Sequence, residues 1–139
     1  MRYVLDTSVW FRSATAPATV PEDVRQILGR RDDQFGLSAI SLWEIGKKNQ
    51  IGKLPLQKDL GLWLKEAVAV SIIVLPLTPE IVADAMSLPD FPNRDPADEL
   101  IVATARVHSL TLLTTDMHLR RYRHAQILHF TPVVINNLR

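Results

Sequence analysis

The sequence contains no cysteine among its 139 residues. Disulfide bonds, zinc sites with thiolate ligands and cysteine nucleophiles are therefore all excluded. A chain without cysteine fits the reducing environment of the cytoplasm, which is where we expect this protein to work.

Long apolar runs are also missing. The longest, AVAVSIIVLPL from Ala67 to Leu77, is well short of the roughly 20 residues that a helix needs to cross a bilayer. The N-terminus, MRYVLDTS, reaches an acidic residue before the apolar core of a signal peptide could form. We therefore expect a soluble protein that does not associate with a membrane.

Neither charge sign is in large excess, since the net charge is +1 and charged residues make up 22% of the chain. This balance neither demands nor excludes a nucleic-acid partner, so any nucleic-acid site must be a local feature. The hydrophobic content of 47% suits one compact domain with a proper core, and we expect residues 1–139 to form it.

Short apolar runs rich in β-branched residues alternate with longer runs of helical spacing. This alternation predicts an α/β fold with a central, mainly parallel sheet. The expected strands are Tyr3–Leu5, Phe35–Ser38, Ile72–Leu75, Thr111–Thr114 and Ile127–Phe130. The expected helices are Pro21–Arg31, Ser41–Gln50, Leu60–Val70, Pro79–Leu88 and Asp95–Ser109. The last of these contains LIVATA, which is apolar on nearly every face and so predicts a helix buried in the core.

Acidic residues occur where such a fold would place a ligand site. Asp6 follows the first strand directly, and Asp116 closes TLLTTD after the fourth strand. Because parallel strands end at the same edge of a sheet, these two carboxylates should approach each other although they are far apart in the sequence. Glu44, Asp95 and Asp98 lie near the starts of helices that begin at the same edge.

Each acid also has a purely structural explanation. Ser41 and Glu44 have the spacing of a capping box, in which the glutamate satisfies a free backbone N–H. Asp95 stands before a proline and suits a helix N-cap. Asp6 and Asp116 could each begin a turn or cap a helix. Capping explains the acids one by one better than it explains the whole set.

Several carboxylates gathered at one sheet edge repel one another, and partial burial adds to the cost of ionising them. A hard divalent cation would offset this repulsion, and Mg²⁺ or Mn²⁺ fits an oxygen ligand set better than zinc does in a chain without cysteine. The four histidines show no ligand spacing that pairs with an acid on one face. The sequence therefore predicts a Mg²⁺ or Mn²⁺ site that could activate water for attack on a phosphodiester.

Three hydroxyl groups flank the predicted metal site. Thr7, Ser8 and Thr114 stand beside the acids, where they could bind a phosphate oxygen or a metal-bound water. Simple turn chemistry is the alternative, and it explains Ser8 equally well.

A basic run, MHLRRYRH, follows the last acid. Its Arg120 and Arg121 could hold the backbone of a polyanion, and Tyr122 could stack on an unpaired base. Arg94 could add to the same rim. The alternative for this run is a solvated helical face.

Taken in order, VLDTS, SLWEI with GKL soon after it, RDPADELIVATA and LLTTD resemble the motifs of PIN-domain ribonucleases. The closest resemblance is to the VapC toxins of bacterial type II toxin–antitoxin pairs, and it covers the chain from Val4 to about Phe130. It implies a three-layer α/β/α domain that cleaves RNA with Mg²⁺ or Mn²⁺ in an acidic pocket. The four motifs in this order and spacing are specific, although no single one is.

The same resemblance implies the roles of individual residues. The metal ligands would be Asp6, Glu44, Asp98 and Asp116, with Asp95 as an alternative to Asp98. Thr7 and Thr114 match hydroxyl positions near the site. The chain departs from the pattern at Ala97 and Glu99, where many relatives have a bulky apolar residue and an arginine.

The resemblance also implies partners. Such toxins commonly form homodimers and are held inactive by a small VapB-like antitoxin whose tail lies in a hydrophobic groove. Trp10, Phe11, Trp43 and Trp63 are the candidates for an exposed apolar surface of this kind. Ordinary core packing is the alternative, and it is the better interpretation of Trp63.

Other classes of protein also gather acids at the edge of an α/β sheet. Metal-dependent phosphatases of the haloacid-dehalogenase type need a second aspartate two residues after the first, where this chain has Ser8. A receiver-like signalling domain needs paired acids early in the chain and a lysine after a late strand, and neither is evident. The remaining alternative is a non-catalytic interaction module whose acids serve only as caps.

Overall fold

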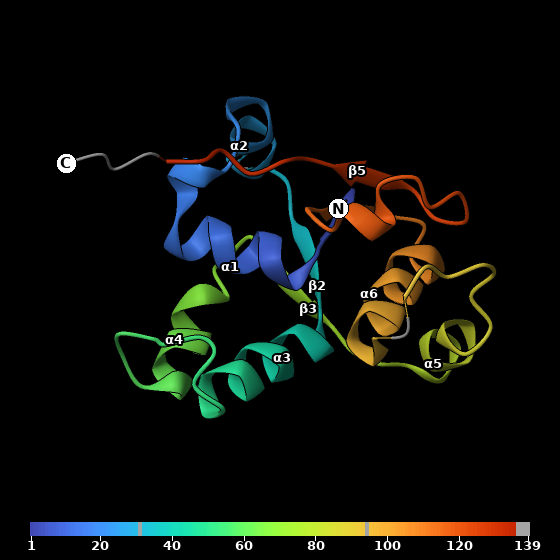
Figure 1. Ribbon diagram of the computed structural model, residues 1–139, viewed down its shortest axis with the longest axis horizontal. Helices are drawn as coiled ribbons and strands as arrows, with labels where there is room; N and C mark the ends of the chain where they lie inside the picture. Colours follow the sequence, from blue (N-terminus) through green and yellow to red (C-terminus); the bar gives the residue numbers. More distant parts are fainter. Residues whose placement is uncertain (31, 94, 136–139) are drawn as a thin grey trace.

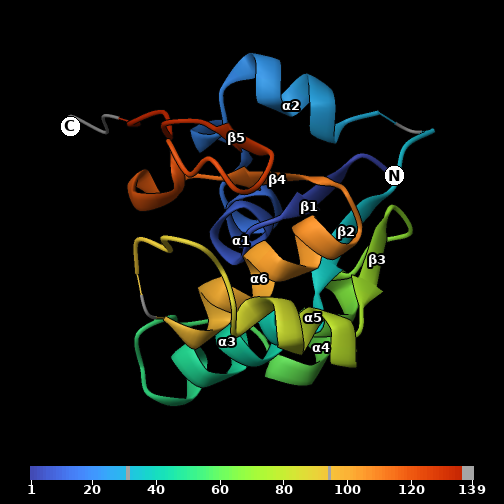
Figure 2. The same cartoon turned by 90° about the vertical axis from the view of Figure 1, so that its right-hand side faces the viewer.

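A five-stranded sheet lies between two layers of helices, with α1 and α2 on one side and α5 and α6 on the other (Figure 1). The computed structural model describes residues 1–30, 32–93 and 95–135. The strands are β1 Tyr3–Leu5, β2 Phe35–Ser38, β3 Ile72–Leu75, β4 Thr111–Thr114 and β5 Ile127–His129. They are all parallel, in the order β3-β2-β1-β4-β5 (Figure 2). The predicted three-layer α/β/α fold with a parallel sheet is confirmed.

Within the described ranges, six helices connect the strands. They are α1 Thr7–Thr15, α2 Glu22–Leu28, α3 Ala39–Gln50, α4 Leu60–Ala67, α5 Pro79–Ala85 and α6 Pro96–Val107, with two short 3-10 turns, η1 Pro17–Thr19 and η2 Met117–Leu119. Helices α2 to α6 were predicted, with ends that differ from the observed ones by at most three residues. Arg31, where the second helix was expected to end, lies outside the described residues. Across the described ranges, no helix combines the length and the apolar character needed to cross a bilayer.

Helix α1 was not predicted. Its residues, TSVWFRSAT, are rich in serine, threonine and valine, which have low intrinsic helix propensity. The helix forms because Asp6 caps it, with Oδ1 accepting a hydrogen bond from the Thr7 N–H at 2.9 Å. Val9 and Trp10 on its inner face are fully buried. Tertiary burial thus outweighs a weak local preference.

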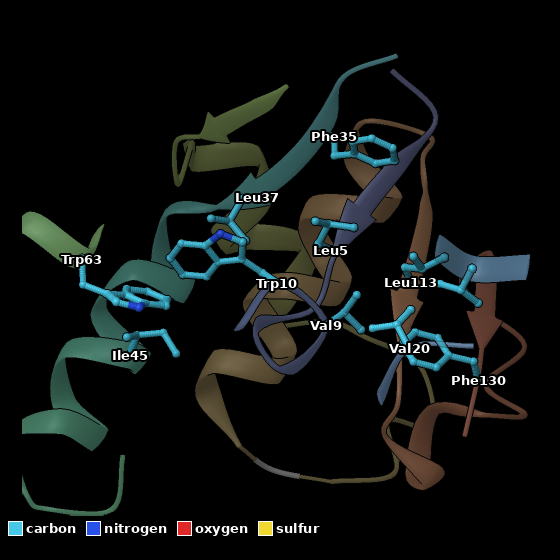
Figure 3. Close-up of a cluster of buried hydrophobic side chains, with 11 residues drawn as sticks. Leu5, Val9, Trp10, Val20, Phe35, Leu37, Ile45, Trp63, Leu113 and Phe130 are labelled. Atoms are coloured by element: carbon cyan, nitrogen blue, oxygen red, sulfur yellow. The ribbon is translucent and has the colours of Figure 1, made fainter. Parts of the chain in front are cut away.

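One face of the sheet packs against α1, α2, α3 and α4 (Figure 3). The cluster combines aliphatic side chains from three strands with side chains from the covering helices: Leu5, Val9, Trp10, Val20, Val24, Phe35, Leu37, Ile45, Trp63, Leu113 and Phe130. Because successive strand residues point to opposite faces, Leu5 and Leu113 enter this cluster while Val4 and Leu112 enter the one behind the sheet.

Two tryptophans join α1 to α4 within this cluster. The rings of Trp10 and Trp63 meet edge to face, with centroids 5.4 Å apart. The Trp10 Nε1–H also donates a hydrogen bond to the Ala67 carbonyl at 3.0 Å. Trp10 and Trp63 are therefore core residues, as expected for Trp63, and Trp10 is wrong as a candidate for exposed surface. Trp43 on α3 is 61% exposed.

Helix α6 covers the opposite face of the sheet, and α5 packs beside α6 (Figures 1 and 2). Ile101 and Val102 of α6 meet Val4 and Leu112 from the strands, and Ala103 packs against α5. The predicted burial of LIVATA is confirmed, since residues 101 to 105 are all buried. This packing fixes the N-terminus of α6 at the edge where the strands end.

Trp10→Phe should lower the free energy of unfolding by about 2–3 kcal/mol, because it leaves a cavity in the core and an unpaired carbonyl on Ala67. Val70→Ala is the control, and it should change the free energy of unfolding by less than about 0.5 kcal/mol because Val70 is 98% exposed. Urea denaturation followed by far-UV circular dichroism measures both. A Trp10→Phe protein as stable as the wild type would contradict this packing.

Candidate active site

The parallel pairing of β1 with β4 brings Asp6 and Asp116 to the same edge of the sheet. Leu5 is in register with Leu113, so both strands end together. Asp6 directly follows β1 and is buried, and its Oδ2 accepts a hydrogen bond from the Thr114 hydroxyl at 2.6 Å. Asp116 caps η2, with Oδ1 accepting from the His118 N–H at 2.9 Å. The predicted approach of these two segments is confirmed.

Glu44 reaches this edge from α3. Its Oε1 lies 2.5 Å from the hydroxyl of Thr7, the first residue of α1. The predicted capping box of Ser41 and Glu44 is wrong, because α3 starts at Ala39 and is capped by Ser38. Ser38 ends the strand that precedes α3, so the helix begins two residues earlier than the sequence pattern suggested. Glu44 is therefore well inside α3, where its side chain is available to the site.

Asp98 comes from the N-terminus of α6. It is the third residue of the helix, as predicted, and its Oδ2 accepts a hydrogen bond from the Asn93 side chain at 3.1 Å. Asp95 caps the helix, as predicted, with Oδ1 accepting from the N–H groups of Ala97 and Asp98. Asp95 is exposed, whereas Asp98 is half-buried.

Burial and, to a smaller extent, the neighbouring carboxylates raise the pKa values of two acids at this edge. Burial raises the pKa of Asp6, and the charges of Glu44 and Asp116 raise it further, against the hydrogen bonds from Thr114 and Thr7, which lower it. Burial also raises the pKa of Asp98, from 3.8 to about 7, and the nearby acids Asp6, Asp95, Glu44 and Asp116 add to the rise. The negative charges of these acids therefore repel one another across the site.

No Lys or Arg of the described ranges forms an ion pair with Asp6, Glu44 or Asp98. The only ring or amine nitrogen near a site acid is Nδ1 of His118, 3.1 Å from Asp116 Oδ1, again counting described residues alone. The described cationic side chains thus offset little of the repulsion between the site carboxylates.

The donor set suits a hard divalent cation, because it consists of carboxylate oxygens whose mutual repulsion a cation would relieve. Within residues 1–30, 32–93 and 95–135, however, no three His, Asp or Glu side chains already enclose a position for a metal ion. Several carboxylate oxygens are held by hydrogen bonds instead, such as Asp6 Oδ2 by Thr114 and Asp98 Oδ2 by Asn93. Side-chain rotation would have to accompany metal binding.

The hydroxyls predicted as substrate contacts differ in exposure. Thr7 and Thr114 are buried, and their hydroxyls bond to Glu44 and Asp6. Both side chains therefore face the carboxylates, and their contact with a phosphate oxygen or a metal-bound water stays a prediction. Ser8 is exposed, and its hydroxyl lies 3.0 Å from that of Thr115.

Sequence reasoning missed three polar residues at this edge, which are Ser41, Asn93 and Thr115. Ser41 is fully buried and its Oγ lies 2.8 Å from the Thr7 hydroxyl. Asn93 donates to Asp98 and accepts from the Asp95 N–H at 2.9 Å. Only Asn93 carried a signal in the sequence, since Asn and Asp side chains commonly organise the turn before a helix.

The basic run after Asp116 is exposed at its three arginines and buried at its tyrosine. Arg120 and Arg121 are exposed, and neither pairs with an acid of the described residues. The Tyr122 hydroxyl donates to the Pro89 carbonyl at 2.7 Å, and its ring packs edge to face on Phe91. The prediction of base stacking by Tyr122 is therefore wrong. Arg94, the other predicted rim residue, lies outside the described residues.

Comparison with known proteins agrees with the resemblance seen in the sequence. A family model described as "PIN domain" matches residues 3–125. The chain is 31% identical over 121 residues to "Ribonuclease VapC22" of Mycobacterium tuberculosis, which covers 87% of this chain and 92% of that protein.

Solved structures share the fold at lower identity. DNA-bound VapBC from Salmonella typhimurium has a TM-score of 0.70 and 17% identity, and covers 93% of this chain and 98% of that one. VapBC2 from Rickettsia felis, bound to a promoter DNA fragment, has a TM-score of 0.69 and 15% identity with the same coverage of 93% and 98%. Since the family model spans most of the sequence and the mycobacterial relative matches along nearly its whole length, this chain belongs to the PIN-domain family.

Proposed function

We propose that the protein is a cytoplasmic, metal-dependent endoribonuclease, a single domain over residues 1–139, that acts as the toxin of a type II toxin–antitoxin pair. The observation that carries this proposal is that acids from four segments gather at one sheet edge without an ion pair to a described Lys or Arg. These acids are Asp6, Glu44, Asp98 and Asp116. Identity of 31% to a ribonuclease along 87% of the chain supports RNA as the substrate.

Asp6, Glu44, Asp98 and Asp116 would hold Mg²⁺ or Mn²⁺. Of the two acids at the start of α6 we assign Asp98 as the ligand, because Asp95 Oδ1 is already engaged by two backbone N–H groups. Asp98 also has its pKa raised by burial and, in addition, by the charges of the other acids. When bound, the ion would lower the pKa of a water and offset the negative charge on a phosphodiester.

The protein's own residues would orient these acids and bind the substrate. Thr114 holds Asp6 by its 2.6 Å hydrogen bond, and Thr7 holds Glu44. Ser8, Arg120 and Arg121 are exposed and would donate hydrogen bonds to phosphate oxygens of the RNA. The phosphates would then be held beside the acids, with no contact to the bases required.

A groove beside α1 supports a VapB-like antitoxin as partner. The groove has a volume of about 910 Å³, and its walls include the partly exposed apolar side chains of Phe11, Leu28, Leu56 and Ile72. A groove of this kind fits the apolar face of an amphipathic helix. It runs along α1 from Trp10 to Thr15 and reaches the starts of β2 and β3 at Phe35 and Ile72.

A homodimer is also part of the proposal. Trp43 on α3 and Val82 and Met86 on α5 are exposed apolar side chains, with exposed fractions of 61%, 42% and 71%. Exposed residues of this kind often mark an interface between subunits.

The proposal predicts that the purified protein cuts total RNA into discrete fragments with Mg²⁺ or Mn²⁺ and not with EDTA. Asp6→Asn should lower the cleavage rate by roughly 100-fold or more, because the ion loses a ligand worth several kcal/mol in the transition state. Gel analysis of labelled RNA measures this, with Asp90→Asn, an exposed acid outside the site, as the control. Equal cleavage by Asp6→Asn would place the activity elsewhere or in a contaminant.

The raised pKa of Asp98 predicts a pH-dependent stability for the metal-free protein. Because this pKa rises from 3.8 to about 7 on folding, the folded state binds more protons in that window, and stability falls as the pH rises through 7. Asp98→Asn should therefore raise the melting temperature by a few degrees at pH 8 in EDTA and leave it unchanged at pH 4. The asparagine can still accept the hydrogen bond from Asn93.

Thermal melting by circular dichroism measures this effect, and Asp90→Asn again controls for the change in net charge. MnCl₂ at pH 8 should raise the melting temperature of the wild type and have a much smaller effect on Asp98→Asn. A wild-type protein that melts at the same temperature with and without MnCl₂ would favour the non-catalytic interaction module instead.

Ala14→Arg should disrupt the antitoxin complex, because Ala14 is exposed and lines the groove. Co-expression with the product of a short adjacent reading frame, followed by size-exclusion chromatography, should yield a complex for the wild type and at least about tenfold less for the variant. Ala18→Arg is the matched control, since Ala18 is exposed outside the groove lining. Equal loss with both variants would mean that the groove is not the docking site.

A further inference from the structure

The roles proposed above leave one buried hydroxyl of the site unused, that of Ser41 on α3. It has no exposed surface, and its Oγ lies 2.8 Å from the Thr7 hydroxyl oxygen. Ser38 already caps α3, so Ser41 has no capping role. The same Thr7 oxygen lies 2.5 Å from Glu44 Oε1. Three side chains therefore converge on a single hydroxyl.

The number of available protons sets the direction of these hydrogen bonds. The Thr7 hydroxyl has one proton and two oxygen neighbours. An ionised carboxylate can only accept, so the Thr7 proton is directed to Glu44. The angles at both contacts are those of donation by Thr7, but its one proton cannot serve two acceptors. With that proton on Glu44, the contact with Ser41 is made by the Ser41 proton, which is donated to the Thr7 oxygen. The hydrogen bonds thus run in series from Ser41 to Thr7 to Glu44.

We infer that Ser41 is a positioning residue, which orients Glu44 through Thr7 and thereby sets the affinity of the acidic site for a divalent cation. The inference rests on the proposed function, because it takes Glu44 to be a metal ligand. Among the described residues, Thr7 is the only hydrogen-bond donor to the Glu44 carboxylate. Whatever fixes the Thr7 hydroxyl therefore fixes the orientation of Oε1 and leaves Oε2 available.

Burial makes this arrangement effective. Ser41 and Thr7 are both buried, so water cannot readily replace either hydroxyl as a partner. In a low-dielectric environment, hydrogen bonds in a chain polarise and strengthen one another. Residues that orient metal ligands typically change metal affinity by about 10–100-fold when they are removed. Ser41 acts through one further residue, so we expect the lower end of that range.

The experiment is isothermal titration calorimetry with MnCl₂ alone. Ser41→Ala should bind Mn²⁺ about tenfold more weakly than the wild type, and Thr7→Val at least as weakly as Ser41→Ala. The double variant should bind no more weakly than Thr7→Val, because Ser41 acts only through Thr7. Ser41→Cys keeps a weak donor in a slightly larger side chain, so it should lie between the wild type and Ser41→Ala.

Thr104→Val is the matched control for loss of a buried hydroxyl. Thr104 is fully buried in α6, and its hydroxyl donates to the Leu100 carbonyl of the same helix at 2.7 Å. This variant should bind Mn²⁺ as the wild type does, even if it is less stable. Circular dichroism of each variant checks that it is folded.

The outcomes separate the inference from the proposed function. Wild-type affinity in Ser41→Ala would overturn the inference and leave the metal site intact. Additive losses in the double variant would also overturn it, because Ser41 would then act by a route other than Thr7. A wild-type protein that does not bind Mn²⁺ would overturn the proposed function itself, and the role of Ser41 with it.

Discussion

The parallel pairing of β1 with β4 is the constraint on which the site depends. It ends two strands at one edge although Asp6 and Asp116 are far apart in the sequence. The order of the strands puts β1 and β4 beside each other near the middle of the sheet, and α3 and α6 begin at the same edge. Here α1 and α6 cover opposite faces of the sheet, and α3 packs against both of them.

Gathering acids in this way costs stability, and the local hydrogen bonds reduce that cost. Each of Asp6, Asp95 and Asp116 caps a helix or turn, so the structural and functional explanations of these acids are not exclusive. A carboxylate that caps a helix is already held in place, which also suits a metal ligand. Burial still raises the pKa values of Asp6 and Asp98, and the charges of the neighbouring acids add to the rise.

Buried hydroxyls link the sheet edge to the helices that surround it. Thr114 connects β4 to Asp6, while Thr7 connects α1 to Glu44 and Ser41 on α3. On the other side, Asn93 connects the segment before α6 to Asp98. The acids are thus supported by neutral donors, which orient a carboxylate without cancelling the charge that a cation needs.

The sequence by itself determined the strands, the buried helix α6 and the approach of Asp6 to Asp116, because these follow from hydrophobic periodicity and from the geometry of parallel sheets. The sequence did not predict α1, because its residues have weak helix propensity. It also placed the start of α3 two residues too late, because the helix is capped by Ser38 instead of Ser41. Only the tertiary structure decided which polar side chains are buried. Hydrogen bonds to partners distant in the chain are made by Thr7, Ser41 and Tyr122. Such contacts cannot be predicted from the local sequence around each residue.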